Sequence, residues 1–161
     1  MTAIPHAARA LVALLLLTGC TVNDHTITQD QATARVEQLI KDTAAALRPE
    51  PRLELIPHGT GPEECTHDSE PPGKVTINRA YWLREIPKSE NMNISRQVRA
   101  YWQAQGHRIV ASGKPDNPDL SGESQPDGFI LALTWAEGDD LFLAATSTCV
   151  WPDGTAPPDG R

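Results

Sequence analysis

The sequence predicts an α+β domain in which two helices pack on one face of a mostly antiparallel sheet. Two observations favour this class. Apolar residues recur at helical spacing in two separate stretches, whereas other stretches alternate apolar and polar residues, as half-buried strands do. The predicted order is helix, strand, strand, helix, strand, strand, strand. Because the links between strands are short or hairpin-like, most of the pairing is expected to be antiparallel.

The first helix is expected to begin near Thr28. Thr28 and Gln31 have the spacing of a capping box, in which each side chain satisfies a free backbone N–H of the other residue. A single apolar stripe follows, formed by Val36, Leu39, Ile40 and Leu47. Pro49 and Pro51 are expected to end the helix.

Two strands are predicted between the helices, separated by a long loop. Residues 52–56 alternate leucine with charged residues, and residues 75–86 are rich in β-branched and aromatic side chains. Residues 57–74 contain proline, glycine and acidic residues without a period, which predicts a loop. Arg79 interrupts the apolar face of the second strand, so a bulge near Asn78 and a strand whose two ends bury opposite faces both stay open.

The second half of the chain predicts a helix and three strands. The helix spans about residues 91–105, ends at Gly106, and has the buried face Ile94, Val98, Tyr101 and Trp102. Strands are expected over residues 107–112, 129–135 and 141–150, the last two forming a hairpin, with a loop over residues 113–128. Trp135 is expected in the core together with Tyr101 and Trp102.

The N-terminal segment is typical of a bacterial lipoprotein signal. Residues 1–9 are weakly basic, residues 10–17 are apolar, and Leu17-Thr18-Gly19-Cys20 has the form of a lipobox. The apolar run is shorter than the roughly 20 residues that span a bilayer. Similarity to lipoprotein signals implies removal of residues 1–19 and acylation of Cys20, for example with palmitate.

The remaining chain is expected to form one domain. Removing 19 of 161 residues leaves 142, divided into a lipidated tether over residues 20–27, a single domain over residues 28–151 and a disordered tail over residues 152–161. One of the 14 basic residues lies in the signal, so 13 remain against 21 acidic residues, a formal charge near −8. This charge argues against nucleic acid as a partner, because nucleic-acid binding depends on cationic contacts to phosphate.

The cysteine count indicates one disulfide. Acylation of Cys20 would leave Cys65 and Cys149, an even pair in an oxidising compartment. A free thiol and a metal ligand are the alternatives for these two residues. The bridge would join the predicted loop to the C-terminal strand.

A metal site is the main alternative that the residues allow. His58, Glu63, Glu64, Cys65 and a His67–Asp68 pair lie in one predicted loop, and such side chains are zinc and copper ligands. The spacing matches no established ligand pair, and a disulfide would remove the thiolate. No cofactor and no metal ligand are therefore assigned.

No catalytic motif is present in the sequence. It contains no Gly-x-Ser-x-Gly elbow, no Ser-x-x-Lys and no phosphate-binding glycine loop. Asn117, Asp119, Ser121 and Gly122 match the first positions of a calcium loop of EF-hand type, but Gly128 stands where the bidentate carboxylate is needed.

Several short motifs resemble small exported lipoproteins of high-GC Gram-positive bacteria. Besides the lipobox, the motifs are Tyr81-Trp82-Leu83, Ala100-Tyr101-Trp102, Asp127-Gly128-Phe129 and Thr148-Cys149-Val150-Trp151-Pro152. The resemblance covers nearly the whole mature chain and implies an exported location and a bridge between Cys65 and Cys149. It implies no catalytic residue. These proteins often have proline before the second cysteine, where this chain has Thr148.

The sequence thus predicts a non-enzymatic lipoprotein on the extracytoplasmic face of the cell membrane, acting as a binding or accessory module of the cell envelope. Its expected partners are the membrane, through the N-terminal lipid, and an envelope protein or small ligand. A metal-dependent hydrolase or metal-binding protein that uses the loop from His58 to Asp68 is one alternative. A carrier of an apolar ligand between the helices and the sheet is another.

Overall fold

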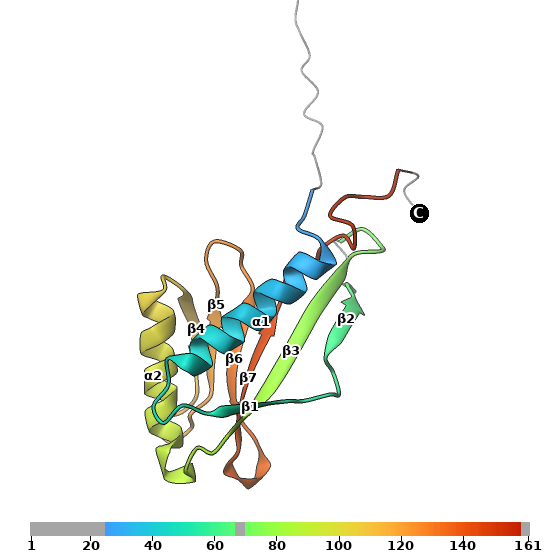
Figure 1. Ribbon diagram of the computed structural model, residues 1–161. Helices are drawn as coiled ribbons and strands as arrows, with labels where there is room; N and C mark the ends of the chain where they lie inside the picture. The colour runs from blue at the N-terminus through green and yellow to red at the C-terminus, as the bar shows by residue number, and fades with distance from the viewer. Residues whose placement is uncertain (1–24, 67–69, 159–161) are drawn as a thin grey trace, which may run out of the picture.

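The computed structural model describes residues 25–66 and 70–158 (Figure 1). In chain order the elements are α1 (Gln29–Ala45), β1 (Arg52–Leu55), β2 (Gly61–Glu64), β3 (Val75–Arg84), a 3₁₀ turn η1 (Lys88–Glu90), α2 (Asn91–Ala104), β4 (Arg108–Ser112), β5 (Leu120–Glu123), β6 (Ile130–Trp135), a second 3₁₀ turn η2 (Glu137–Asp139) and β7 (Leu141–Thr146). The predicted α+β class is confirmed: two helices accompany one antiparallel sheet. Among these described residues, no helix is long and apolar enough to cross a membrane.

The sheet is antiparallel at every pairing, with the strand order β1-β3-β7-β6-β5-β4. β3 is its longest strand, and both β1 and β2 pair with it along one edge while β7 pairs along the other. The outer edges are irregular. β4 shifts register between Ile109 and Ala111, and β2 contains Pro62, whose nitrogen carries no hydrogen to donate.

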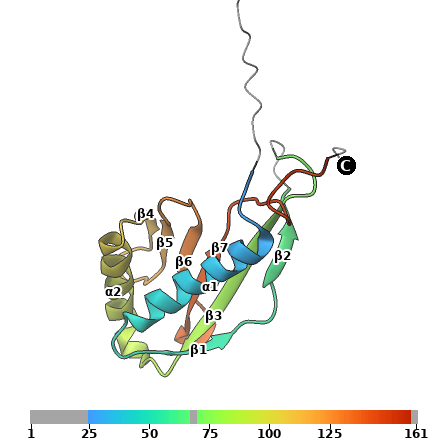
Figure 2. The same cartoon turned by 45° about the horizontal axis from the view of Figure 1, so that its top comes forward.

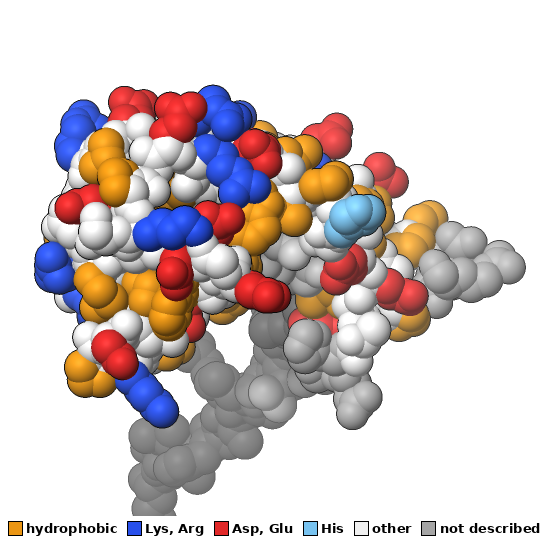
Figure 3. Space-filling view, turned by 90° about the horizontal axis from the view of Figure 1, so that it is seen from below, with side chains coloured by type: hydrophobic (Ala, Val, Ile, Leu, Met, Phe, Trp, Pro, Cys, Tyr) orange, Lys and Arg blue, Asp and Glu red, His pale blue; other side chains and the backbone are white. Residues whose placement is uncertain are grey.

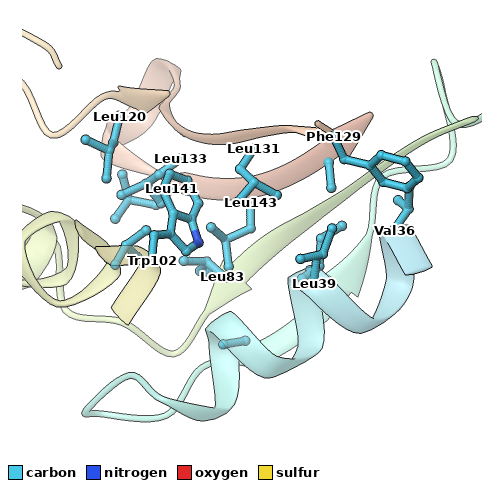
Figure 4. Packing of buried hydrophobic residues seen from close by; sticks show 14 of the residues in the cluster. Val36, Leu39, Leu83, Trp102, Leu120, Phe129, Leu131, Leu133, Leu141 and Leu143 are labelled. Atoms are coloured by element: carbon cyan, nitrogen blue, oxygen red, sulfur yellow. The ribbon is translucent and has the colours of Figure 1, made fainter. Parts of the chain in front are cut away.

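Both helices cover the same face of the sheet, as predicted (Figures 1 and 2). α1 lies across β3 and β7, whereas α2 lies against β4 and β5. The residues of this face that point at the helices are mostly leucine and phenylalanine, and they meet the apolar stripes of α1 and α2 in one core (Figure 4). Trp102 of α2 lies between the two helices and the sheet, and its indole N–H donates to Thr43 of α1 at 3.0 Å.

The ends of the helices follow the predicted signals closely. Thr28 and Gln31 form the complete capping box, with the Gln31 N–H donating to Thr28 Oγ1 at 3.2 Å and the Thr28 N–H donating to Gln31 Oε1 at 2.9 Å. α1 ends at Ala45, before the prolines, yet Leu47 is still fully buried. At the end of α2, Gly106 has the positive φ of 81° that the prediction requires.

Two strands were missed by the sequence prediction. Residues 57–74 contain β2, and residues 113–128 contain β5, so that neither stretch is only a loop. β2 reads Gly-Pro-Glu-Glu and is exposed along most of its length, whereas β5 buries Leu120 and Gly122. Both strands are held by pairing to a neighbour, β3 and β6 respectively, rather than by an apolar pattern of their own.

Arg79 interrupts the apolar face of β3, and neither of the two predicted explanations, a bulge or a strand whose ends bury opposite faces, holds. The register between β3 and β7 runs without a shift, so there is no bulge near Asn78. Arg79 lies instead on the face that α1 covers, where its Nε is 3.4 Å from Glu37 Oε1. Tyr81 joins the same carboxylate, and its hydroxyl donates to Glu37 at 2.8 Å. Burial and this hydrogen bond raise the pKa of Tyr81 to about 12.

Two further predictions are wrong. Trp135 lies at the end of β6 and is 41% exposed, and its indole N–H donates to Asp139 Oδ1 at 3.2 Å. The start of the tail is bound to the domain rather than free: the Thr26 N–H donates to Gly154 O at 2.9 Å and the Gln29 N–H donates to Pro152 O at 3.0 Å. The C-terminal segment therefore packs against the start of α1, whereas residues 159–161 lie outside the described part.

Candidate functional site

Most of the predicted site residues fall outside any assembled site. Cys20 lies outside the described residues, as do His67 and Asp68. Cys65 and Cys149 form the predicted disulfide, with an S–S distance of 2.20 Å and a Cα–Cα distance of 6.2 Å. Within residues 25–66 and 70–158, no three histidine, cysteine, aspartate or glutamate side chains are grouped so that they can hold a metal ion.

The residues that match part of a calcium loop act as local structure. Asn117 Oδ1 accepts the Asp119 N–H at 2.7 Å, and Asp119 Oδ1 accepts the Trp135 N–H at 2.6 Å. Ser121 and Gly122 belong to β5 and lie on opposite faces of the sheet. These side chains therefore tie β5 to β6 and do not converge on one point.

A polar pocket of about 210 Å³ is the better candidate. It lies where α1 passes the C-terminal end of α2, the start of β4 and the loop between β5 and β6. Its lining comes from α1 (Arg35, Gln38, Leu39 and Asp42), from α2 and the residues after it (Tyr101, Gln105 and His107) and from that loop (Gln125). We call this site the polar pocket.

One wall of the polar pocket is fixed by an ion pair. Arg35 Nε donates to Asp127 Oδ2 at 2.6 Å, and Ser124 Oγ donates to the other carboxylate oxygen of Asp127. Ser124 is fully buried and also accepts the Phe129 N–H at 3.0 Å. Burial alone would raise the pKa of Asp127, but the hydrogen bonds from Ser124 and Arg35 outweigh it and lower that pKa. The charge of Arg35 is thus balanced by Asp127.

The surroundings of His107 favour its neutral form. Burial lowers its pKa, and the nearby positive charge of Arg35 lowers it further, against a smaller opposite effect of Asp127. Its Nδ1 accepts the backbone N–H of Gln125 at 3.2 Å. A neutral imidazole whose Nδ1 accepts carries its proton on Nε2, so His107 offers a hydrogen-bond donor from Nε2.

Tyr101 and Asp42 supply the groups of the pocket that have no partner in the described structure. Tyr101 packs its ring against the core, and its hydroxyl forms no hydrogen bond within the described residues. Burial raises the pKa of Tyr101, and the negative charge of Asp42 adds to the effect. Asp42 is exposed and makes no ion pair with a described residue. Both side chains are therefore available to a ligand.

The Arg35–Asp127 pair leads to a testable pH dependence of stability. Because the pKa of Asp127 is lowered on folding, its ionised form stabilises the fold at pH values above the ordinary value of 3.8, and this contribution is lost as the pH falls through the folded-state pKa. We expect Asp127→Asn to lower the free energy of unfolding at neutral pH. The difference from the unmodified chain should shrink in acid.

Urea unfolding followed by circular dichroism at neutral and acidic pH measures this difference. Asp116→Asn is the matched control, because Asp116 is exposed and forms no ion pair with a described residue. A constant difference between the Asp127→Asn variant and the unmodified chain at all pH values would contradict the assignment.

The sheet face opposite the helices is a second candidate surface for a ligand. A row of small residues crosses five strands of it, paired as Ala80, Ala144, Ala132, Ser121 and Ala111. Beside this row, Trp82 and Phe142 meet edge to face with ring centroids 5.4 Å apart. A shallow hollow of about 350 Å³ lies over β4, β5 and β6. The face is mainly apolar and offers few groups that would orient a ligand.

Charged side chains lie at the far end of the sheet, but they are paired with one another. Arg84 bonds Glu54 at 3.0 Å and Asp140 at 3.1 Å, and Arg52 bonds Glu85 at 3.0 Å. Figure 3, which views the molecule from below, shows acidic and basic side chains interspersed on this side. This end therefore presents no patch of one charge.

In comparisons with protein-family models, with curated proteins and with solved structures, nothing matches this chain.

Proposed function

We propose that this chain is a lipid-anchored, extracytoplasmic lipoprotein that acts as a non-catalytic binding module of the cell envelope. The lipobox at Cys20 supports the anchor, and the polar pocket supports binding. The observation that carries the binding proposal is the unpartnered Tyr101 hydroxyl beside the free carboxylate of Asp42. A half-buried hydroxyl without a hydrogen bond is a group that a ligand can satisfy.

The arrangement of the pocket favours binding over catalysis. A nucleophilic mechanism needs a hydroxyl or thiol within hydrogen-bond reach of a base. Ser124 is fully buried and bonded to Asp127, and the raised pKa of the Tyr101 hydroxyl makes it a poor nucleophile. His107 uses Nδ1 to accept a backbone N–H, and it is held neutral. The pocket therefore holds its hydrogen-bonding groups in place without pairing a nucleophile with a base.

The two alternatives have less support. In a metal-dependent hydrolase, the loop from His58 to Asp68 would have to supply ligands without its thiolate, because Cys65 is bonded to Cys149. A carrier of an apolar ligand would need space between the helices and the sheet. That region is filled by large buried side chains, among them Trp102 and Phe129 (Figure 4).

The anchoring proposal predicts acylation at one cysteine. When the full chain is expressed in a bacterium fed with an alkyne-tagged palmitate, we expect label in the membrane fraction and a processed N-terminus at Cys20 by mass spectrometry. Cys20→Ala should lose both the label and the cleavage. The labelled band and the mass of the N-terminal peptide are the two measurements.

A double variant, Cys65→Ala with Cys149→Ala, is the matched control because it keeps Cys20 while removing the other two cysteines. It should still be labelled. Palmitate label that persists in the Cys20→Ala variant would overturn the anchoring proposal.

A further inference from the structure

We infer that the polar pocket binds a neutral polyhydroxylated ring, such as a single sugar residue, through direct hydrogen bonds to its hydroxyl groups. This inference rests on the proposed binding function and names the chemical class of the ligand. It depends on three properties of the pocket: its charge, its mixture of hydrogen-bond donors and acceptors, and its size.

The charges of the pocket disfavour an anion. The guanidinium of Arg35 is bound to Asp127 at 2.6 Å, and His107 is neutral, so neither adds a net positive charge. Asp42 contributes a negative charge with no counter-ion among the described residues. Water screens this exposed charge, but the lining holds no unpaired cation that could bind a phosphate or carboxylate. Binding of an anion is therefore unfavourable.

The same groups do not form a good site for a cation. Asp42 is the one unpaired carboxylate of the lining, and it lies at an exposed position where water screens it. The pocket contains one aromatic ring, that of Tyr101, whereas quaternary ammonium sites surround the cation with several rings.

The lining of the pocket holds both hydrogen-bond donors and acceptors. Gln38, whose Oε1 accepts Arg35 Nη1 at 3.4 Å, keeps its amide N–H groups free. His107 Nε2 donates, Asp42 accepts, and the Tyr101 hydroxyl can do either. A ligand that matches such a surface must itself donate and accept at neighbouring atoms. Hydroxyl groups on a ring have this property, because each is one donor and an acceptor.

The size of the pocket limits the ligand to about one ring. Its volume of about 210 Å³ lies below the range of roughly 300–1,000 Å³ that is typical of pockets for drug-sized ligands. Leu39 and the Tyr101 ring are its apolar contacts, and they can pack against the C–H face of a sugar. The remaining side chains contact the ligand edge through hydrogen bonds.

Saturation-transfer difference NMR on the full chain in detergent tests this inference, because it detects weak ligands of large particles. The probes are the methyl glycosides of glucose, galactose, mannose and arabinose, with methylammonium and choline as cations and acetate and methyl phosphate as anions. We expect saturation transfer to at least one glycoside. Tyr101→Phe should weaken binding of that glycoside about tenfold, as the loss of one hydrogen bond does.

Tyr81→Phe is the matched control, because the Tyr81 hydroxyl bonds Glu37 instead of lining the pocket. Asp42→Asn is a second variant and should also weaken binding of the glycoside. Circular dichroism checks that both variants stay folded. Pocket-dependent binding of a cation or anion in place of every glycoside would overturn the sugar inference but leave the binding proposal intact. Binding of no probe, or binding unchanged in both pocket variants, would overturn both.

Discussion

Replacing both Cys65 and Cys149 with serine is expected to lower the free energy of unfolding by about 2–5 kcal/mol. The bridge closes a loop of 84 residues, for which the chain-entropy model gives about 4.5 kcal/mol. Cys65 directly follows the edge strand β2, and the Cys65 N–H donates to Lys74 O at 3.0 Å. Because β2 buries little apolar surface, the bridge is a main constraint on this edge of the sheet.

Guanidinium unfolding in the presence and absence of a reductant measures the loss. Cys20→Ala is the control, since it removes a cysteine and leaves the bridge. Hydrogen exchange should show that the amides of β2 lose protection before those of β6 in the reduced protein. Equal stability of the oxidised and reduced forms would show that the paired strands hold β2 without the disulfide.

Trp102→Ala is expected to destabilise the domain by about 3–5 kcal/mol, as large-to-small substitutions of buried aromatic residues do. Trp102 is 1% exposed and its indole N–H donates to Thr43 Oγ1 at 3.0 Å, so the variant leaves a cavity and loses this hydrogen bond, while the Thr43 hydroxyl still donates to Leu39 O at 2.7 Å. The ring also lies directly above Gly122 of β5. A Cβ atom at Gly122 would come within 3.0 Å of it.

Trp135→Ala is the matched control, because Trp135 is 41% exposed. Its replacement should lower the free energy of unfolding, measured by thermal or urea unfolding, much less than Trp102→Ala does. Trp102→Phe separates the two contributions, since it keeps a ring and removes the hydrogen bond. Similar losses at both tryptophan positions would contradict the central place of Trp102 in the core.

The elements that the sequence predicted well are those with a complete internal pattern. The capping box at Thr28, the stripe of α2 and the strict alternation in β6 are each local, so they can be recognised without knowledge of the neighbours. β2 and β5 are different. β2 has no large apolar residue, and β5 has a glycine where Trp102 leaves no room for a side chain. Their strand conformation depends on pairing with residues far away in the sequence.

Charged and aromatic positions were misread for the same reason. Arg79 lies on the helix-covered face because Glu37, which is distant in the sequence, neutralises it. Trp135 has the same parity as the buried residues Leu131 and Leu133, but at the end of β6 it is 41% exposed. Alternation indicates which side of a sheet a residue faces, and it cannot indicate how far the covering layer extends.

The polar pocket was not predicted, because its residues are separated in the chain and common on surfaces. Glutamines 38, 105 and 125 carry no motif, and they meet only when α1, α2 and the β5–β6 loop are assembled. Two weak signals were present. Tyr101 places a polar tip at the edge of an apolar stripe, and His107 follows the glycine that ends α2.

The irregular edges of the sheet would have a consequence if the proposed lipid anchor holds the protein at a membrane. Lipid-anchored molecules diffuse in two dimensions, where crowding brings the edge strands of neighbouring copies together. The register shift at Ile109 and Ala111 in β4, the proline in β2 and the four-residue length of β1 leave neither edge with a long regular row of N–H and C=O groups for a neighbour's strand to extend. Copies of this chain can therefore be densely packed on a surface without merging into a continuous intermolecular sheet.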